Sequence, residues 1–148
     1  DVLLGRRKAG DRVAVIGGGE VGCEVAWYLA EKGKRVTILE MLGNLANDVN
    51  MFSRFYLLDK LTELNVDMQT NTTAQEITDK GVVAMDMDGN KKVIEADTVV
   101  LAIGFKPNNE LEKKLKRIAP ELYTIGDCVK PRKIGEAIGG GSRVARLI

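Results

Sequence analysis

The sequence predicts an α/β fold of three layers, built from a parallel β-sheet, helices and an inserted antiparallel β-meander. Strand-like apolar runs alternate with helical spacing through the first half of the chain. A turn signal, Asp88-Gly89-Asn90, then separates two later runs, and a buried run, TVVLAI, follows at 98–103. Strands that alternate with helices pair in parallel, whereas an Asp-Gly turn joins antiparallel neighbours.

The first half of the chain supplies the strands and helices of the parallel layer. Short β-branched or apolar runs predict strands at 12–16, 35–39 and 66–69. Helical spacing of apolar residues predicts helices at 20–32 and 51–64, the first of them stopped by Gly33. The strand at 12–16, the helix at 20–32 and the strand at 35–39 fit one β-α-β crossover unit, in which the two strands are parallel.

The second half begins with three expected strands, at 74–78, 81–87 and 91–95, which form the meander. A parallel strand at 98–103 follows, and the chain breaks at Pro107. Beyond the break we expect a helix at 110–117, a strand at 122–125 and helical spacing over 134–148. The last segment contains Gly139, Gly140 and Gly141, which predict either a kink or a helix that starts after them.

Composition excludes several classes of function. The chain has 148 residues, enough for one ordinary domain, and its 22 Lys and Arg balance 21 Asp and Glu. We therefore expect neither a nucleic acid nor an anionic membrane as a partner. No apolar run is long enough to cross a bilayer and no leader pattern opens the sequence, so we expect a cytoplasmic protein.

The chain contains no histidine and two cysteines, Cys23 and Cys128, which lie far apart. No metal-site spacing exists, so we predict no metal ligand, and a histidine-dependent catalytic triad is impossible. We assign no catalytic residue, because any chemistry would come from a bound group. Cys23 is expected to pack as a small hydrophobe, and Cys128 to be an inert thiol.

The strongest functional signal is VAVIGGGEVGCE at 13–24, where glycines join a strand to a helix. Gly17-x-Gly19-x-x-Gly22 in this context matches the fingerprint of dinucleotide-binding, Rossmann-like domains. Gly17 would allow a tight turn, Gly19 would let a pyrophosphate approach the backbone, and Gly22 would let the helix pack closely. The helix N-terminus would attract the phosphates. The alternative is a structural turn without a ligand.

Glu40 follows the second expected strand, 18 residues after Gly22. A carboxylate there can accept hydrogen bonds from both hydroxyls of an adenosine ribose, and it would repel a 2′-phosphate. No Arg or Lys follows at 41–44 to offset that repulsion, which favours NAD(H) over NADP(H). The alternative is a solvated residue at the strand end.

Three motifs in this order resemble the NAD(H)-binding domain of flavoprotein pyridine-nucleotide oxidoreductases. GGGEVGCE is similar to the nucleotide loop, ADTVVLAIGFKPN at 96–108 to the exit strand, and LYTIGDC at 122–128 to a segment that binds FAD. The resemblance is nearest to the C-terminal part of NADH:flavin oxidoreductases of the 2,4-dienoyl-CoA reductase and enoate reductase group. In that group an FMN barrel and an iron–sulfur cluster precede an FAD domain, into which the NAD(P)H domain is inserted.

The resemblance implies a role for each matched residue. Glu40 would hold the adenosine ribose, and the pyrophosphate would be lined by Gly17, Gly18, Gly19, Glu20, Val21 and Gly22. Glu24 would lie near the nicotinamide and the flavin, although a first-turn carboxylate favoured by the helix dipole is an equal alternative. Ile103 and Gly104 would pass close to the dinucleotide. Asp127, after Gly126, would bond a flavin ribityl hydroxyl, unless the pair forms only a turn.

The resemblance also implies that the sequence is a piece of a larger enzyme. The sequence lacks a second glycine fingerprint, the FMN barrel and the cluster cysteines that this group contains. We expect a connector at 1–10, an NAD(H)-binding domain at 11–106 and a remnant of an FAD-binding domain at 107–148. The chain would present NADH for hydride transfer to FAD, would be inactive alone, and would have the rest of its own polypeptide as partner. The redox CxxxxC of disulfide reductases is absent, which argues against that activity.

The sequence leaves two other functions open. The first is a non-catalytic NAD(H)-binding module, such as a redox sensor, which needs the glycine loop and Glu40 but not Gly126 and Asp127. The second is a Rossmann-type domain for another adenosine ligand, such as S-adenosylmethionine, although closely spaced glycines suit a pyrophosphate better. An exposed apolar helix face would favour a homodimer.

Overall fold

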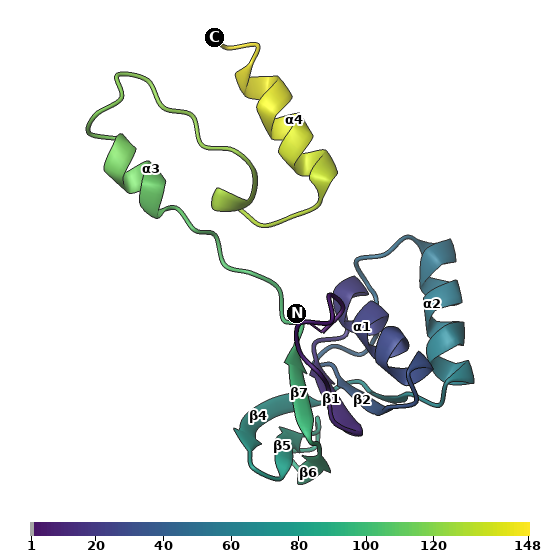
Figure 1. Ribbon diagram of the computed structural model, residues 1–148. Helices are drawn as coiled ribbons and strands as arrows, with labels where there is room; N and C mark the ends of the chain where they lie inside the picture. Colours follow the sequence, from purple (N-terminus) through teal and green to yellow (C-terminus); the bar gives the residue numbers. More distant parts are fainter. Residues whose placement is uncertain (1) are drawn as a thin grey trace. The chain divides into compact units, whose positions relative to one another are not determined.

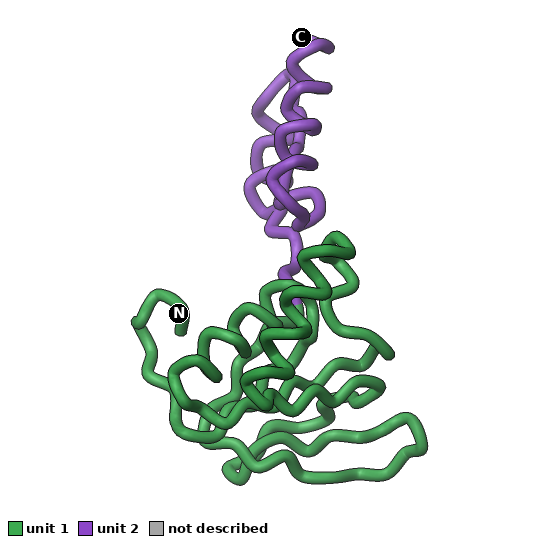
Figure 2. Tube along the Cα trace, turned by 90° about the vertical axis from the view of Figure 1, so that its right-hand side faces the viewer, with its two compact units in different colours: residues 1–103 green, residues 104–148 purple. Residues whose placement is uncertain are grey.

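The computed structural model describes residues 2–148, which form two compact units (Figure 2). The first unit ends at Ile103, and the second comprises Gly104–Ile148. No helix within residues 2–148 is long and apolar enough to span a bilayer.

A parallel sheet forms the centre of the first unit. It is built from β1 (Arg12–Ile16), β2 (Arg35–Leu39), β3 (Asp67–Gln69) and β7 (Thr98–Leu101). The order is β3-β2-β1-β7, and every pairing is parallel. The carboxyl ends of these strands therefore meet at one edge, where Ile16 lies opposite both Leu39 and Leu101.

Two helices, α1 (Glu20–Glu31) and α2 (Met51–Glu63), cover one face of this sheet (Figure 1). Side chains from alternate strand positions meet the helices in a buried cluster, because successive strand residues point to opposite faces. The cluster includes Val13, Val15 and Ile38 from the strands, with Cys23, Ala26, Leu29, Leu57 and Leu61 from the helices.

The opposite face of the sheet carries an antiparallel meander of β4 (Thr73–Thr78), β5 (Gly81–Met85) and β6 (Lys91–Glu95). A second buried cluster joins Ala14 and Leu39 of the sheet to Val82, Ala84 and Ala96. Helices, parallel sheet and meander are thus three layers, so the predicted fold class is confirmed.

One strand of the meander is shorter than predicted. It ends at Met85 rather than Met87, because the Asp86 carboxylate accepts hydrogen bonds from the backbone N–H groups of Asp88 and Asn90. These bonds close the turn before the next strand begins. The strand predicted at 98–103 similarly ends at Leu101.

The second unit contains α3 (Glu110–Leu115), a 3₁₀ turn at Gly126–Cys128 and α4 (Ile134–Val144). The strand predicted at 122–125 is not formed. A strand needs a neighbour for its backbone groups, and the described residues of this unit supply none.

The alternative in which α4 starts after its glycines is also wrong, because the helix begins at Ile134 and includes all of them. Its small residues face the segment before the 3₁₀ turn. A Cβ at Gly140 would lie 3.7 Å from Cβ of Ile125, and one at Gly141 would lie 3.7 Å from its Cδ1. These are ordinary contact distances, so packing against Ile125 does not itself require glycine at either position.

Candidate functional site

The glycine loop lies where the parallel strands end. Gly17 adopts φ +103°, and its N–H donates a 2.9 Å hydrogen bond to the carbonyl of Leu39. A Cβ at Gly17 would lie 2.5 Å from the Ala102 carbonyl oxygen, so backbone conformation and space both require glycine. The loop thus passes between the ends of β2 and β7, the edge at which open α/β sheets bind ligands.

Gly18 and Gly22 are required by packing within the protein. A Cβ at Gly18 would overlap the side chain of Leu45, and a Cβ at Gly22 would overlap the carbonyl oxygen of Gly17. The Gly22 position is also 3.3 Å from Cβ of Ala102. Gly22 lets the first turn of α1 pack directly on the loop, and Gly18 lets the loop pack against Leu45 and Glu40.

Gly19 differs from the other glycines of the loop. Its φ of −71° suits any residue, and the nearest atom to an added Cβ is Oδ1 of Asp48, at an ordinary contact distance of 3.5 Å. Neither backbone strain nor packing requires a glycine here. The nearest atoms to the missing side chain belong to the Asp48 carboxylate, which lies beside the N-terminus of α1.

Asp48 lies beside this N-terminus and was not anticipated from the sequence. Its Oδ1 accepts a 2.9 Å hydrogen bond from the backbone N–H of Glu20, the first residue of α1. Asp48 belongs to the segment that joins β2 to α2, and no local motif marks it, because it lies 28 residues from its bonding partner. Val21, the next helical residue, is exposed.

Glu40 is buried, with 9% of its surface exposed, and both of its carboxylate oxygens are engaged. Oε2 accepts a 2.6 Å bond from the N–H of Gly18, and Oε1 accepts a 2.8 Å bond from the N–H of Leu42. The alternative of a solvated strand-end residue is therefore wrong. Each oxygen retains a second acceptor lone pair, so the carboxylate can orient the loop and still accept from a ligand.

A cavity of about 430 Å³ adjoins the loop and lies wholly within the first unit. This volume is in the range of small-molecule sites. The cavity brings together residues from the ends of three parallel strands and from the start of β4; its lining comprises Ile16, Gly17, Gly19, Leu39, Glu40, Met41, Thr72, Thr73, Ala74, Ala102 and Ile103.

Several predicted site residues lie outside this lining. Glu24 is exposed on the second turn of α1, and Gly18 and Gly22 are buried behind the loop. Gly104 begins the second unit with φ +81°, and an added Cβ there would meet nothing within 4 Å. The structure thus groups Gly17, Gly19, Glu40 and Ile103 around one cavity.

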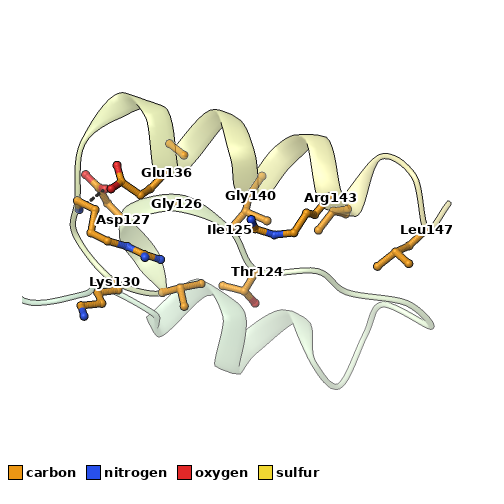
Figure 3. Close-up of a pocket in the computed structure, with 13 residues that line it drawn as sticks. Thr124, Ile125, Gly126, Asp127, Lys130, Glu136, Gly140, Arg143 and Leu147 are labelled. Atoms are coloured by element: carbon orange, nitrogen blue, oxygen red, sulfur yellow. Dashed lines mark hydrogen bonds between the residues drawn. The ribbon is translucent and has the colours of Figure 1, made fainter.

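Gly126 and Asp127 line a different cavity, of about 300 Å³, within the second unit (Figure 3). Gly126 has φ +70°, which favours glycine, and Oδ1 of Asp127 accepts a 3.3 Å hydrogen bond from the N–H of Arg132. The opposite wall is α4, from which Glu136, Gly140 and Arg143 face the cavity (Figure 3).

The two thiols differ in environment. Cys23 is fully buried, as predicted, and its Sγ–H donates to the carbonyl of Gly18 at 3.4 Å. Burial, with a smaller contribution from the charge of Asp48, raises the pKa of this thiol to about 12. Cys128 is half-buried and donates to the carbonyl of Ile125 at 2.8 Å.

Comparison with known proteins identifies the family. Residues 2–141 match the model of the pyridine nucleotide-disulphide oxidoreductase family. The chain belongs to this family. Its resemblance to flavoprotein pyridine-nucleotide oxidoreductases is confirmed, and the family implies a pyridine nucleotide and a flavin as cofactors.

The named relatives are oxidoreductases. The chain is 43% identical to an NADH oxidase of Thermoanaerobacter brockii, over 98% of this chain and 23% of that protein. It is 33% identical to a cinnamate reductase of Clostridium sporogenes, over 100% of this chain and 23% of that protein. The chain thus spans about a quarter of the length of the curated relatives that it matches.

Solved structures of oxidoreductases also match the whole chain over about a quarter of their own length. A 2-naphthoyl-CoA reductase in complex with 2-naphthoyl-CoA is 42% identical with a TM-score of 0.87, over 100% of this chain and 23% of that one. A histamine dehydrogenase from Rhizobium sp. 4-9 has a TM-score of 0.89 over 100% of this chain and 25% of that one. Its sequence identity is 20%, so this likeness shows the fold alone.

Proposed function

We propose that this chain is the NADH-binding part of a larger flavin-dependent oxidoreductase. It holds the dinucleotide across the glycine loop, with the adenosine ribose at Glu40, and presents the nicotinamide for hydride transfer to FAD. The observation that carries the proposal is Gly19, the one glycine of the fingerprint that neither backbone strain nor packing explains.

A pyrophosphate explains Gly19. The first N–H groups of a helix have no partner in the preceding turn and favour anions, but a phosphate must approach the backbone to use them. A Cβ at Gly19 would stand in that path, although it would make no close contact within the protein itself. Gly17, Gly18 and Gly22 then have a supporting role, because they set the loop against the strand ends and α1 against the loop.

Glu40 supports NADH over NADPH. Two backbone N–H groups fix its carboxylate at the rim of the cavity, where it can accept hydrogen bonds from both ribose hydroxyls. A 2′-phosphate about 4 Å away would meet a repulsion of roughly 4 kcal/mol at an effective dielectric of 20. Since screening reduces that figure, we expect at least a tenfold preference, which corresponds to about 1.4 kcal/mol.

The second unit supports the flavin part of the proposal. Asp127 and Gly126 would hold the flavin ribityl chain, but a cavity of about 300 Å³ is at the lower limit for a small-molecule site and too small for a whole flavin dinucleotide. We propose that the rest of the polypeptide completes this site. By resemblance, that remainder also carries FMN and an iron–sulfur cluster.

Within this scheme the chain contributes binding and orientation. NADH supplies the hydride and the flavin accepts it. Ile103 and Gly104 would pass close to the dinucleotide, and Glu24 would lie toward its nicotinamide end. The isolated chain should therefore bind NADH without oxidising it.

The test is a titration of the chain with NADH, NADPH and FAD. Trp27, the only tryptophan, lies half-buried on α1, so quenching of its fluorescence by bound nicotinamide reports binding. We expect NADH to bind at least tenfold more tightly than NADPH, with constant NADH absorbance and no retained FAD. Tight FAD retention, or no binding of either nicotinamide dinucleotide, would overturn the assignment of the loop.

A further inference from the structure

We propose that Asp48 limits the affinity of the glycine loop for the dinucleotide by holding a negative charge on the N-terminus of α1. The inference rests on the proposed function and deepens it: Asp48 tunes how tightly the diphosphate is held. Such a charge would favour release of the nucleotide after each turnover, because it weakens the bound state.

The geometry places the carboxylate on the surface that a diphosphate would use. Oδ1 of Asp48 accepts the N–H of Glu20 at 2.9 Å. Its two oxygens lie 3.5 and 3.6 Å from the point at which a Cβ of Gly19 would stand. A diphosphate that approaches Gly19 therefore meets this carboxylate, and both would compete for the N–H of Glu20.

Other acidic groups add to the negative charge near the N-terminus of α1. Burial raises the pKa of the Cys23 thiol, and the charges of Asp48, Glu40 and Glu24 raise it further, in keeping with a negative charge near the first turn of α1. Among them, Asp48 bonds the helix N-terminus itself. The positive end of the helix dipole is thus partly neutralised by the protein.

The segment that carries Asp48 is held in place by other contacts. The N–H of Ala46 donates to the Gly18 carbonyl at 2.7 Å, and Nε of Arg54 donates to the Leu45 carbonyl at 2.7 Å. Leu45 and Ala46 are also buried in the cluster beneath α1. Removal of the charge on Asp48 should therefore leave the loop in place, so that an effect on binding can be separated from an effect on folding.

The experiment compares the wild-type chain with Asp48→Asn and a charge-matched control, Asp79→Asn. Asparagine retains an oxygen that can accept from Glu20, whereas Asp79 is exposed in the turn between β4 and β5. We expect Asp48→Asn to bind NADH about fivefold more tightly at roughly 10 mM salt, a ratio that falls toward one at about 1 M, where the Debye length is about 3 Å. ADP-ribose should show the same gain, adenosine none, and the control variant none.

The outcomes separate this inference from the proposed function. If the wild-type chain binds NADH and Asp48→Asn binds it equally or less tightly, with an unchanged melting temperature, Asp48 is a helix cap and the inference is wrong, while the function stands. A gain that is the same at low and high salt, or that extends to adenosine, would likewise contradict a charge effect. If neither protein binds NADH, the proposed function fails, and the inference fails with it.

Discussion

Alanine substitutions at two glycines of the fingerprint, Gly19 and Gly22, should have different consequences for folding. Gly19→Ala adds a methyl group whose nearest neighbour is Asp48 Oδ1, 3.5 Å away, at a φ of −71° that alanine adopts readily. Gly22→Ala adds one that overlaps the carbonyl oxygen of Gly17. The first change should therefore spare the fold, and the second should not.

The magnitudes follow from these contacts. At Gly19, alanine is a poorer helix N-cap than glycine, but it reduces the entropy of the unfolded chain, and each effect is worth less than about 1 kcal/mol with opposite sign. The free energy of unfolding should thus change by less than about 0.5 kcal/mol. At Gly22 the helix or the loop must shift, which costs about 3 kcal/mol for overpacking and lowers the melting temperature by roughly 10 °C.

Although Gly19→Ala should spare the fold, it should weaken the binding of NADH. A methyl group at Gly19 blocks the approach of the pyrophosphate, so we expect NADH to bind at least about tenfold more weakly, a loss of about 1.4 kcal/mol. The assay pairs thermal unfolding by circular dichroism with quenching of Trp27 fluorescence by NADH. If Gly19→Ala folds normally and binds NADH as tightly as the wild-type chain, the dinucleotide does not cross this loop, and the reasoning is refuted.

Other side chains give further predictions. Glu40→Gln leaves one of two backbone N–H groups without its acceptor, so the unfolding free energy should fall by about 1–3 kcal/mol and NADH should bind more weakly; an unchanged affinity would exclude Glu40 from the ribose site. Side-chain and backbone hydrogen bonds with Arg12 lower the pKa of Asp97 from 3.8 to about 2. Since this folded-state pKa is depressed, its stabilisation is present above pH 4 and is lost between pH 4 and 2, and the melting curves of wild type and Asp97→Asn should converge over that window. Iodoacetamide at pH 8 should leave Cys23 unlabelled until guanidinium is added, because Cys23 is buried and its thiol has a pKa of about 12; labelling of Cys23 in the native chain would contradict its burial.

The layers of the fold were predictable because their signals are local. Periodicity located β1, β2 and both helices of the first unit to within one or two residues, and the Asp-Gly turn marked the meander. The prediction of a strand at 122–125 was wrong for a non-local reason. The residues of this segment suit a strand, but strand formation also depends on a neighbour, which a single segment cannot reveal.

The sequence predicted residues of the candidate site but not the hydrogen bonds between them. Spacing alone identified the glycines and Glu40. It could not show that Glu40 holds the N–H of Gly18, or that Asp48 bonds the start of α1, because these contacts join residues 22 and 28 positions apart. Nor could it distinguish the glycines that packing requires from Gly19, which packing does not.

The most direct test of the central claim is to locate bound NADH on the chain by its effect on backbone amide resonances. We predict that the largest ¹⁵N–¹H shift changes occur at Gly18, Gly19 and Glu20, with a second group around Glu40 at the rim of the same cavity. NADPH at the same concentration should produce smaller changes at these positions. Changes centred instead on Gly126 to Cys128, in the other unit, would contradict the assignment of the glycine loop to NADH.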